Sequence, residues 1–161
     1  MGKIARKLFM TFINTDPSAT AKYEVLGTDL EEFNIEMGAN VIKSPNILGE
    51  NSISIDKYEK TSSVEPYKAE ADSDLFKFLK PIIDEEKTLD DLKTDVVHVN
   101  LFDTATGGAY PAHKEDVVIE VVSYGGNTEG FQIPFNIHYT GIRKKGTFNP
   151  TTKTFTEAIG G

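Results

Sequence analysis

The most constraining feature of the sequence is a strict alternation of apolar and polar side chains across residues 130–141. The apolar members are Phe131, Ile133, Phe135, Ile137 and Tyr139. A period of two residues places alternate side chains on opposite faces of an extended strand. The segment therefore predicts a strand with one buried face. Pro134 has no amide hydrogen to donate, so it predicts an edge, a bulge or a non-bonded position.

Shorter apolar or alternating runs predict further strands at residues 8–13, 22–26, 30–37, 47–58, 96–102 and 115–124. Two of these strands are expected to turn an apolar face inward and a small or acidic polar face outward. The expected inward residues are Phe33, Ile35, Met37, Ile53 and Ile55. Residues 38–40 predict a turn, and residues 146–155 predict a closing hairpin around Asn149-Pro150.

A helix is predicted from Asp72 or Ser73 onward, because apolar residues then recur at helical spacing. Pro81 falls inside this pattern and predicts a kink or two short abutting helices. Residues 59–71 show no periodicity and predict a long loop, and residues 84–95 predict an acidic connector. The chain is expected to form one domain over residues 1–161, with roughly eight strands and one helix.

The net charge of −8 is unevenly distributed. Residues 1–12 carry +3 and residues 142–161 carry +3, so the acidic charge lies between them, at −14. This balance argues against a broad basic face for binding a polyanion. It leaves open an ordinary solvated surface, complementary contact between copies of the chain, or an acidic surface that repels an anion.

Residue chemistry predicts no catalytic residue, no metal ligand and no cofactor. The chain has no cysteine, which excludes disulfides and thiolate chemistry, and its three histidines lack the spacing of a zinc site. The glycine-rich residues 125–130 precede a predicted strand, whereas a phosphate cradle needs a helix N-terminus. No run approaches the about 18 apolar residues of a membrane span, and we expect a cytosolic product without an export signal.

Four blocks of the sequence resemble the major tail protein, or tail tube protein, of long-tailed bacteriophages and prophages of Gram-positive bacteria. The blocks are LEEFNIEM, NILGENSISIDKYE, EPYKAEADSDLFKFLKPIID and VSYGGNTEGFQIPFNIHYTGIRKKGTFNPTTKTFT. The resemblance extends from about residue 5 to residue 157, and the last block is its most specific part.

The resemblance implies a mainly β (α+β) fold, a two-sheet β-sandwich or barrel with one flanking α-helix. It also implies hexameric rings that stack into a tube, with four strands of each subunit lining the DNA channel. The implied partners are other copies of the chain, the tape measure protein and other tail proteins, and double-stranded DNA in transit. The implied location is the virion tail, after a stay in the host cytoplasm, with no membrane partner.

Acidic and small polar groups on a channel wall would repel phosphate and limit friction with moving DNA. The expected channel-lining residues are Glu32, Asn34, Glu36, Ser52, Ser54 and Asp56. Contacts between subunits are expected from a basic N-terminal arm (1–12), the long loop (59–71) and the C-terminal hairpin (142–157). The residues expected there are Lys3, Arg6, Lys7, Tyr67, Arg143, Lys144 and Lys145.

Three alternatives remain open at this point. The polar faces could be an ordinary wet sheet surface. The chain could be a different phage component, such as a head decoration or receptor-binding domain. An enzyme would need a buried carboxylate or histidine cluster in a cleft, which the sequence does not reveal.

Overall fold

The computed structural model describes residues 2–28, 30, 32–65 and 67–158, and its regular structure is mainly β, with 51% strand. The strands are β1 (Phe9–Asn14), β2 (Tyr23–Leu26), β3 (Ile35–Glu36), β4 (Ala39–Pro45), β5 (Asn51–Tyr58), β6 (Thr61–Val64), β7 (Lys93–Asn100), β8 (Tyr110–Val121), β9 (Gly125–Asn127), β10 (Gly130–Gln132), β11 (Phe135–Asn149) and β12 (Thr154–Glu157). The α-helix is α1 (Asp74–Glu85), and the short 3-10 helices are η1 (Arg6–Leu8) and η2 (Leu89–Leu92).

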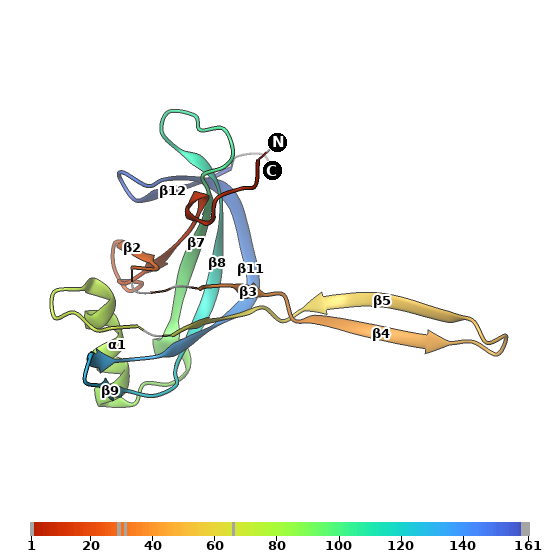
Figure 1. The fold of residues 1–161 in the computed structure, drawn as a ribbon, viewed down its shortest axis with the longest axis horizontal. Coiled ribbons are helices and arrows are strands. Elements are labelled where there is room, and N and C mark those ends of the chain that lie inside the picture. Colours follow the sequence, from red (N-terminus) through yellow and green to blue (C-terminus); the bar gives the residue numbers. More distant parts are fainter. Residues whose placement is uncertain (1, 29, 31, 66, 159–161) are drawn as a thin grey trace.

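One antiparallel sheet of eight strands forms the body, in the order β2-β1-β7-β8-β11-β6-β3, with β12 paired to β11 (Figure 1). Two separate two-stranded hairpins, β4–β5 and β9–β10, complete the strand structure. The large sheet curls into a half-barrel with α1 against one face. The expected mainly β fold with one flanking helix is confirmed.

The curl of the sheet is visible in a contact between strands that are not neighbours. Phe12 on β1 and Phe148 on β11 have ring centroids 4.6 Å apart, although β7 and β8 lie between their strands in the sheet. These two rings join Tyr23, Val97 and Val99 in a buried cluster on the sheet face that points away from α1. The sheet thus encloses a core of its own at this end.

The opposite face of the sheet forms a second core beneath α1. Leu75, Leu79 and Ile82 of the helix are buried with Val117 and Ile119 of β8 and with other apolar side chains of the sheet. Ser73 is the N-cap, as expected, and its hydroxyl accepts a hydrogen bond from the Phe76 amide at 3.4 Å. The helix continues through Pro81 as one element, so of the two expected outcomes, a kink or two short abutting helices, the second does not occur.

One expected strand and the turn expected after it differ from the structure. Among the described residues of the segment 30–37, the strand is limited to Ile35–Glu36, and the expected turn at residues 38–40 instead leads into β4, which begins at Ala39. Gly38 has φ of 58°, and a Cβ at this position would lie 2.1 Å from the Glu59 carbonyl oxygen. The Glu59 amide donates to the Gly38 carbonyl at 3.0 Å. The two chain segments are therefore paired by a backbone hydrogen bond at the position where a turn was expected.

Other expected boundaries also shift. The segment expected as a long loop (59–71) contains β6, which pairs with β11 inside the sheet. The expected basic arm (1–12) includes the start of β1, and Phe12 is buried there. The strand expected over residues 130–141 divides into β10 and β11, with Pro134 at the break. The C-terminal hairpin is confirmed, with Phe148 paired to Phe155.

Candidate functional site

The β4–β5 hairpin projects far from the body of the molecule (Figure 1). It continues the β3–β6 pairing in the same register, because Glu36 pairs with Thr61 and Ala39 pairs with Tyr58. The Gly38–Glu59 hydrogen bond lies between these two pairs. Residues 35–45 and 51–62 thus form one ribbon, of which one half belongs to the sheet and the other half stands in solvent.

One face of the projecting hairpin is apolar and uncovered. The large apolar side chains on it are Val41, Ile53, Ile55 and Tyr58, with exposed fractions of 49%, 67%, 51% and 54%, and Lys43 lies among them as the ladder partner of Ile53. Ile55 pairs with Val41, and direct partners in an antiparallel ladder point to the same face. The expectation that Ile53, Ile55 and Met37 turn inward is wrong for the single chain, since each is more than half exposed.

A β-bulge keeps this apolar face aligned with the core face of the sheet. Lys57 pairs with Asn40 and Ile55 pairs with Val41, so Asp56 is the extra residue on β5. Beyond the bulge, Tyr58 alternates in phase with Ser62 and Val64, which are buried on the side of the sheet that α1 covers. The hairpin thus extends the core face of the sheet beyond the body.

The tip of the hairpin also presents apolar side chains. Ile47 is fully exposed and Leu48 is 78% exposed. The side-chain oxygen of Asn46 accepts hydrogen bonds from the amides of Leu48 and Glu50, at 2.9 and 3.0 Å. These two bonds fix the turn, so the apolar pair is held in a defined position.

The expected channel-lining residues on β5 occupy the opposite, polar face of the hairpin. The Ser52 hydroxyl donates to the Ser44 carbonyl at 3.2 Å, and the side-chain amide of Asn40 donates to the Asp56 carboxylate at 2.7 Å. The shared register places Ser52, Ser54, Asp56 and Glu36 on this one face, where Ile42 is the apolar exception as the partner of Ser54. Glu32 and Asn34 precede β3, are exposed, and hydrogen-bond to each other at 2.9 Å.

This polar face continues across the sheet on β6, β11 and β8, which the sequence reasoning missed. Asn136 pairs with both Ser63 and Glu120 in the ladder, and the His138 ring lies 2.7 Å from the Glu120 carboxylate. Hydrogen bonds from His138 and then Asn136 lower the pKa of Glu120. The alternation of residues 130–141 marks Asn136 and His138 as polar, but only the strand order brings Glu36, Ser63 and Glu120 beside them.

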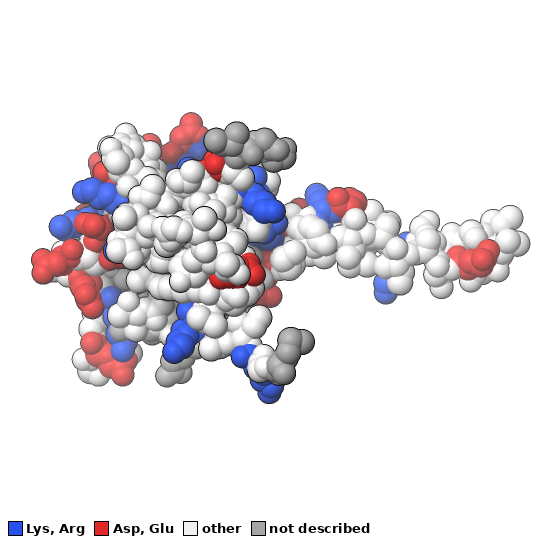
Figure 2. All heavy atoms as spheres, turned by 90° about the horizontal axis from the view of Figure 1, so that it is seen from above, with Lys and Arg blue, Asp and Glu red and all other residues white. Residues whose placement is uncertain are grey.

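In the view of Figure 2, charged side chains gather around the edges of the body, and the projecting hairpin carries a few charged groups of both signs. The residues expected at subunit contacts occupy separate places. Lys3 and Lys7 are exposed ahead of β1, and Arg6 donates to the carbonyls of Phe9 and Phe33 at 2.6 and 3.0 Å. Consecutive exposed positions on β11 hold Arg143, Lys144 and Lys145.

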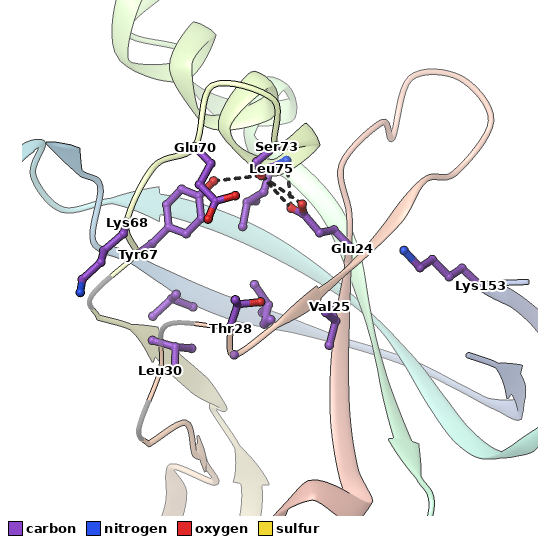
Figure 3. A pocket seen from close by; sticks show the side chains of 13 residues that line it. Glu24, Val25, Thr28, Leu30, Tyr67, Lys68, Glu70, Ser73, Leu75 and Lys153 are labelled. Carbon is purple, nitrogen blue, oxygen red and sulfur yellow. Dashed lines mark hydrogen bonds between the residues drawn. The ribbon is translucent and has the colours of Figure 1, made fainter. Parts of the chain in front are cut away.

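The expected contact residue Tyr67 lies in the wall of a cavity of about 270 Å³ between the end of β2 and the start of α1 (Figure 3). Its hydroxyl is 3.1 Å from the Ser73 hydroxyl. The Glu24 carboxylate accepts hydrogen bonds from the Ser73 hydroxyl and from the Leu75 amide, both at 3.0 Å. Of the two acidic residues that line this cavity, Glu24 and Glu70, Glu24 is thus bound to the helix N-terminus.

A buried polar network crosses the sheet face on the α1 side. Glu115 on β8 is 3% exposed and forms an ion pair with Lys60, and its other oxygen lies 3.3 Å from Nε2 of His98 on β7. His98 Nδ1 lies 2.9 Å from the Thr11 hydroxyl, and Tyr139 lies 3.2 Å from Nε2. Every buried polar side chain atom among the described residues has a partner.

The electrostatics of this network favour an ionised Glu115 beside a neutral His98. Burial alone would raise the pKa of Glu115, but hydrogen bonds from His98 and Lys60 outweigh burial and lower the pKa to about 2. Burial lowers the pKa of His98, and the Glu115 hydrogen bond opposes that shift only in part. Sequence reasoning missed this cluster because its members are distant in the chain and meet only through the strand order.

Within the ranges that the structure describes, no group of three or more His, Cys, Asp or Glu side chains is arranged to hold a metal ion. The described helices include none with the length and hydropathy needed to cross a membrane. The fold and these surfaces therefore define a mainly β protein with a projecting hairpin, β4–β5, that is exposed along its whole length. No protein-family model matches the chain, and no curated protein matches it.

Proposed function

We propose that this chain is a structural subunit that self-assembles into hexameric rings, which stack into the tail tube of a long-tailed bacteriophage. The sequence blocks described above support this proposal by their resemblance to major tail proteins. In this function the subunits enclose double-stranded DNA without sequence-specific binding, and they meet the tape measure protein and other tail proteins in the virion tail.

The observation that carries the proposal is the uncovered apolar face of the β4–β5 hairpin. A two-stranded hairpin alone in water is marginally stable at best, and a contiguous exposed apolar surface marks a site of association. Here Ile53, Ile55 and Tyr58 are all more than half exposed on a ribbon that leaves the body. A second copy of the chain is the partner in this proposal, because assembly into a polymer covers every hairpin in the same way.

The exposed polar face of β3, β6, β11 and β8 is the observation that supports a DNA channel in this proposal. Its side chains include the carboxylates of Glu36 and Glu120 and small or neutral polar groups such as those of Ser63 and Asn136. Carboxylates on a channel wall repel the phosphates of passing DNA, and neutral polar groups keep the wall wetted. Four neighbouring strands with such a face are the part of the sheet that fits a channel wall.

Negative-stain electron microscopy of the purified chain over a range of concentrations tests the proposal. We expect rings or tubes of uniform diameter at high concentration, with sedimentation velocity reporting the same transition. A chain that stays monomeric at every concentration, with or without the tail initiation proteins, would contradict self-assembly. Decoration of a preformed capsid without tubes would indicate a head decoration protein instead.

A further inference from the structure

Lys60 stands at the point where the ribbon leaves the sheet. It lies between the end of β5 at Tyr58 and the start of β6 at Thr61. Its backbone carbonyl accepts a hydrogen bond from the Tyr139 amide at 3.1 Å. Its side chain is only 15% exposed and turns back into the body, where the ammonium pairs with Glu115. Residue 60 is thus held to β11 by its backbone and to β8 by its side chain.

The partner of Lys60 is itself fixed from several strands. Glu115 is held by His98 on β7, and Arg143 on β11 approaches the same carboxylate at 3.9 Å. The Tyr139 ring lies under the Lys60 ammonium, with 5.2 Å between the nitrogen and the ring centroid. The groups that surround the pair come from β1, β6, β7, β8 and β11: Thr11, Ser62, His98, His113, Tyr139 and Arg143.

On the body side of Lys60 the backbone ladder continues through the Glu36–Thr61 and Thr61–His138 pairs, and the described contacts on the hairpin side are weaker. The Glu59 amide donates to Gly38, which joins the two strands of the ribbon to each other and not to the body. Lys57 and Glu59 form an ion pair at 3.3 Å, but their side chains are 60% and 73% exposed, so solvent screens the pair. Every residue of β4 and β5 is exposed. The direction of the hairpin therefore depends on its root.

We propose that the buried Lys60–Glu115 ion pair is the anchor that fixes the direction in which the β4–β5 hairpin leaves the sheet. Such a role accounts for an ionic contact in this place. A buried ion pair adds little net stability compared with two apolar side chains, because each ion loses its hydration. It does impose a defined geometry, since a displaced ammonium would leave the Glu115 carboxylate buried with its charge poorly compensated.

The anchor is a property of the single chain and goes beyond the proposed function. Its consequence for assembly rests on that function: a hairpin with a fixed direction meets a neighbouring copy without first losing orientational freedom. Lys60 is therefore a positioning residue for a contact that the hairpin itself makes.

Distance measurement between two spin labels tests the anchor in the monomer. The chain has no cysteine, so Leu48→Cys at the hairpin tip and Lys77→Cys on α1 give two unique labelling sites, both exposed. Lys60→Met and Glu115→Gln remove the anchor from either side. The matched control is Lys57→Met with Glu59→Gln, which removes the exposed ion pair formed three residues and one residue before Lys60.

We expect the parent and the control to give the same narrow distance distribution, and each anchor variant to broaden it about twofold or more. Equal widths in folded parent and anchor variants would overturn the proposal. If the single variants fail to fold, the double variant Lys60→Met with Glu115→Met tests the anchor, because it removes both charges of the pair. A folded double variant with the parent width, or one that also fails to fold, would show that the pair serves the sheet and not the hairpin.

This measurement is independent of assembly. A parent that never forms rings would contradict the proposed function, while the label distances would still decide the anchor. In the converse case, the parent forms tubes while the anchor variants give the parent's width of the distance distribution. That result would support the proposed function and overturn the anchor.

Discussion

Phe12 on β1 and Phe148 on β11 lie with their rings 4.6 Å apart, across the interior of a sheet in which two other strands separate them. Both rings are almost fully buried, with 2% and 0% exposure. Tyr23 packs its edge against Phe148 at 5.6 Å. The contact closes one end of the half-barrel, so the curvature of the sheet and the burial of these rings depend on each other.

Phe148→Ala is expected to lower the free energy of unfolding by about 3–5 kcal/mol, the range for a large aromatic deleted from a core. Chemical denaturation followed by circular dichroism measures it. The control is Phe131→Ala on β10, whose side chain is 40% exposed and whose loss should cost much less. Equal losses in the two variants would show that the contact across the curled sheet is not a special source of stability.

Ile53→Ser together with Ile55→Ser is expected to raise the protein concentration needed for assembly about tenfold or more, because two exposed apolar side chains lose the burial that a partner would provide. The fold of the monomer should change little, since both residues are exposed in the single chain. Sedimentation velocity measures assembly. The matched control is Ser52→Ala with Ser54→Ala on the opposite face of the same strand, and an equal effect there would contradict an apolar contact.

The stability of the monomer is expected to fall in two stages as the pH is lowered. Burial lowers the pKa of His98 in the folded chain, so below pH 6.5 the unfolded chain binds a proton that the folded chain resists, and unfolding becomes easier. Glu115 adds a second loss as the pH falls from 4.5 toward about 2, where its carboxylate protonates in the folded chain.

Denaturation midpoints measured between pH 7.5 and 3 check this order. His98→Gln should flatten the first stage, provided that the variant folds. His113→Gln should flatten it less, because burial lowers the pKa of His113 on a ring that is only partly buried. A first stage that persists unchanged in both variants would assign the pH dependence to other groups.

Glu36→Lys and Asp56→Lys are each expected to leave assembly intact and to slow release of the genome from phage particles, because a lysine on the channel wall would attract DNA phosphates. DNA release triggered in vitro and followed by dye fluorescence measures the rate. Glu157→Lys on β12 makes the same charge change at another exposed position. Loss of rings in the Glu36 or Asp56 variant would place those side chains at subunit contacts instead.

Gly38→Ala is expected to disturb the exit of the ribbon, because Gly38 has φ of 58° and its new Cβ would lie 2.1 Å from the Glu59 carbonyl oxygen. Faster hydrogen exchange at the Glu59 amide, which donates to Gly38, would report the disturbance. Gly49→Ala is a suitable comparison, since its φ of 80° is also positive but nothing lies within 4 Å of a Cβ there. Similar exchange in the two variants would mean that backbone strain, and not the close contact, is the cause.

Strands and helix were predictable wherever burial imposes a period on the sequence. The alternation around Phe135 and Ile137 and the spacing of Leu75, Leu79 and Ile82 correspond to buried faces in the structure. Prediction failed where pairing occurs without burial. The strand β4 has no buried residue and begins next to a glycine, so local chemistry suggested a turn. Prediction failed at β6 for a different reason: Ser62 and Val64 are buried there, but the strand has four mostly polar residues and shows no clear period, so only its pairing with β11 and β3 reveals it.

The candidate surfaces were predictable only in part. The polar alternation of Ser52 and Ser54 identified one face of β5, but the opposite apolar face was expected to be buried. That error has a physical reason: periodicity shows that a face is apolar, not whether the same chain covers it. The ion pair of Lys60 and Glu115 joins residues 55 positions apart, and no local pattern indicates such a contact.

The continuity of the ribbon has a mechanical consequence. Because β4–β5 extends β3–β6 in register, a pull on the hairpin along its length is directed along β6. The four residue pairs between β6 and β11, from Thr61–His138 to Val64–Phe135, then bear the load together in shear and do not open one after another. A subunit held by its neighbours through this hairpin would therefore transmit tension directly to the β6–β11 ladder of its sheet.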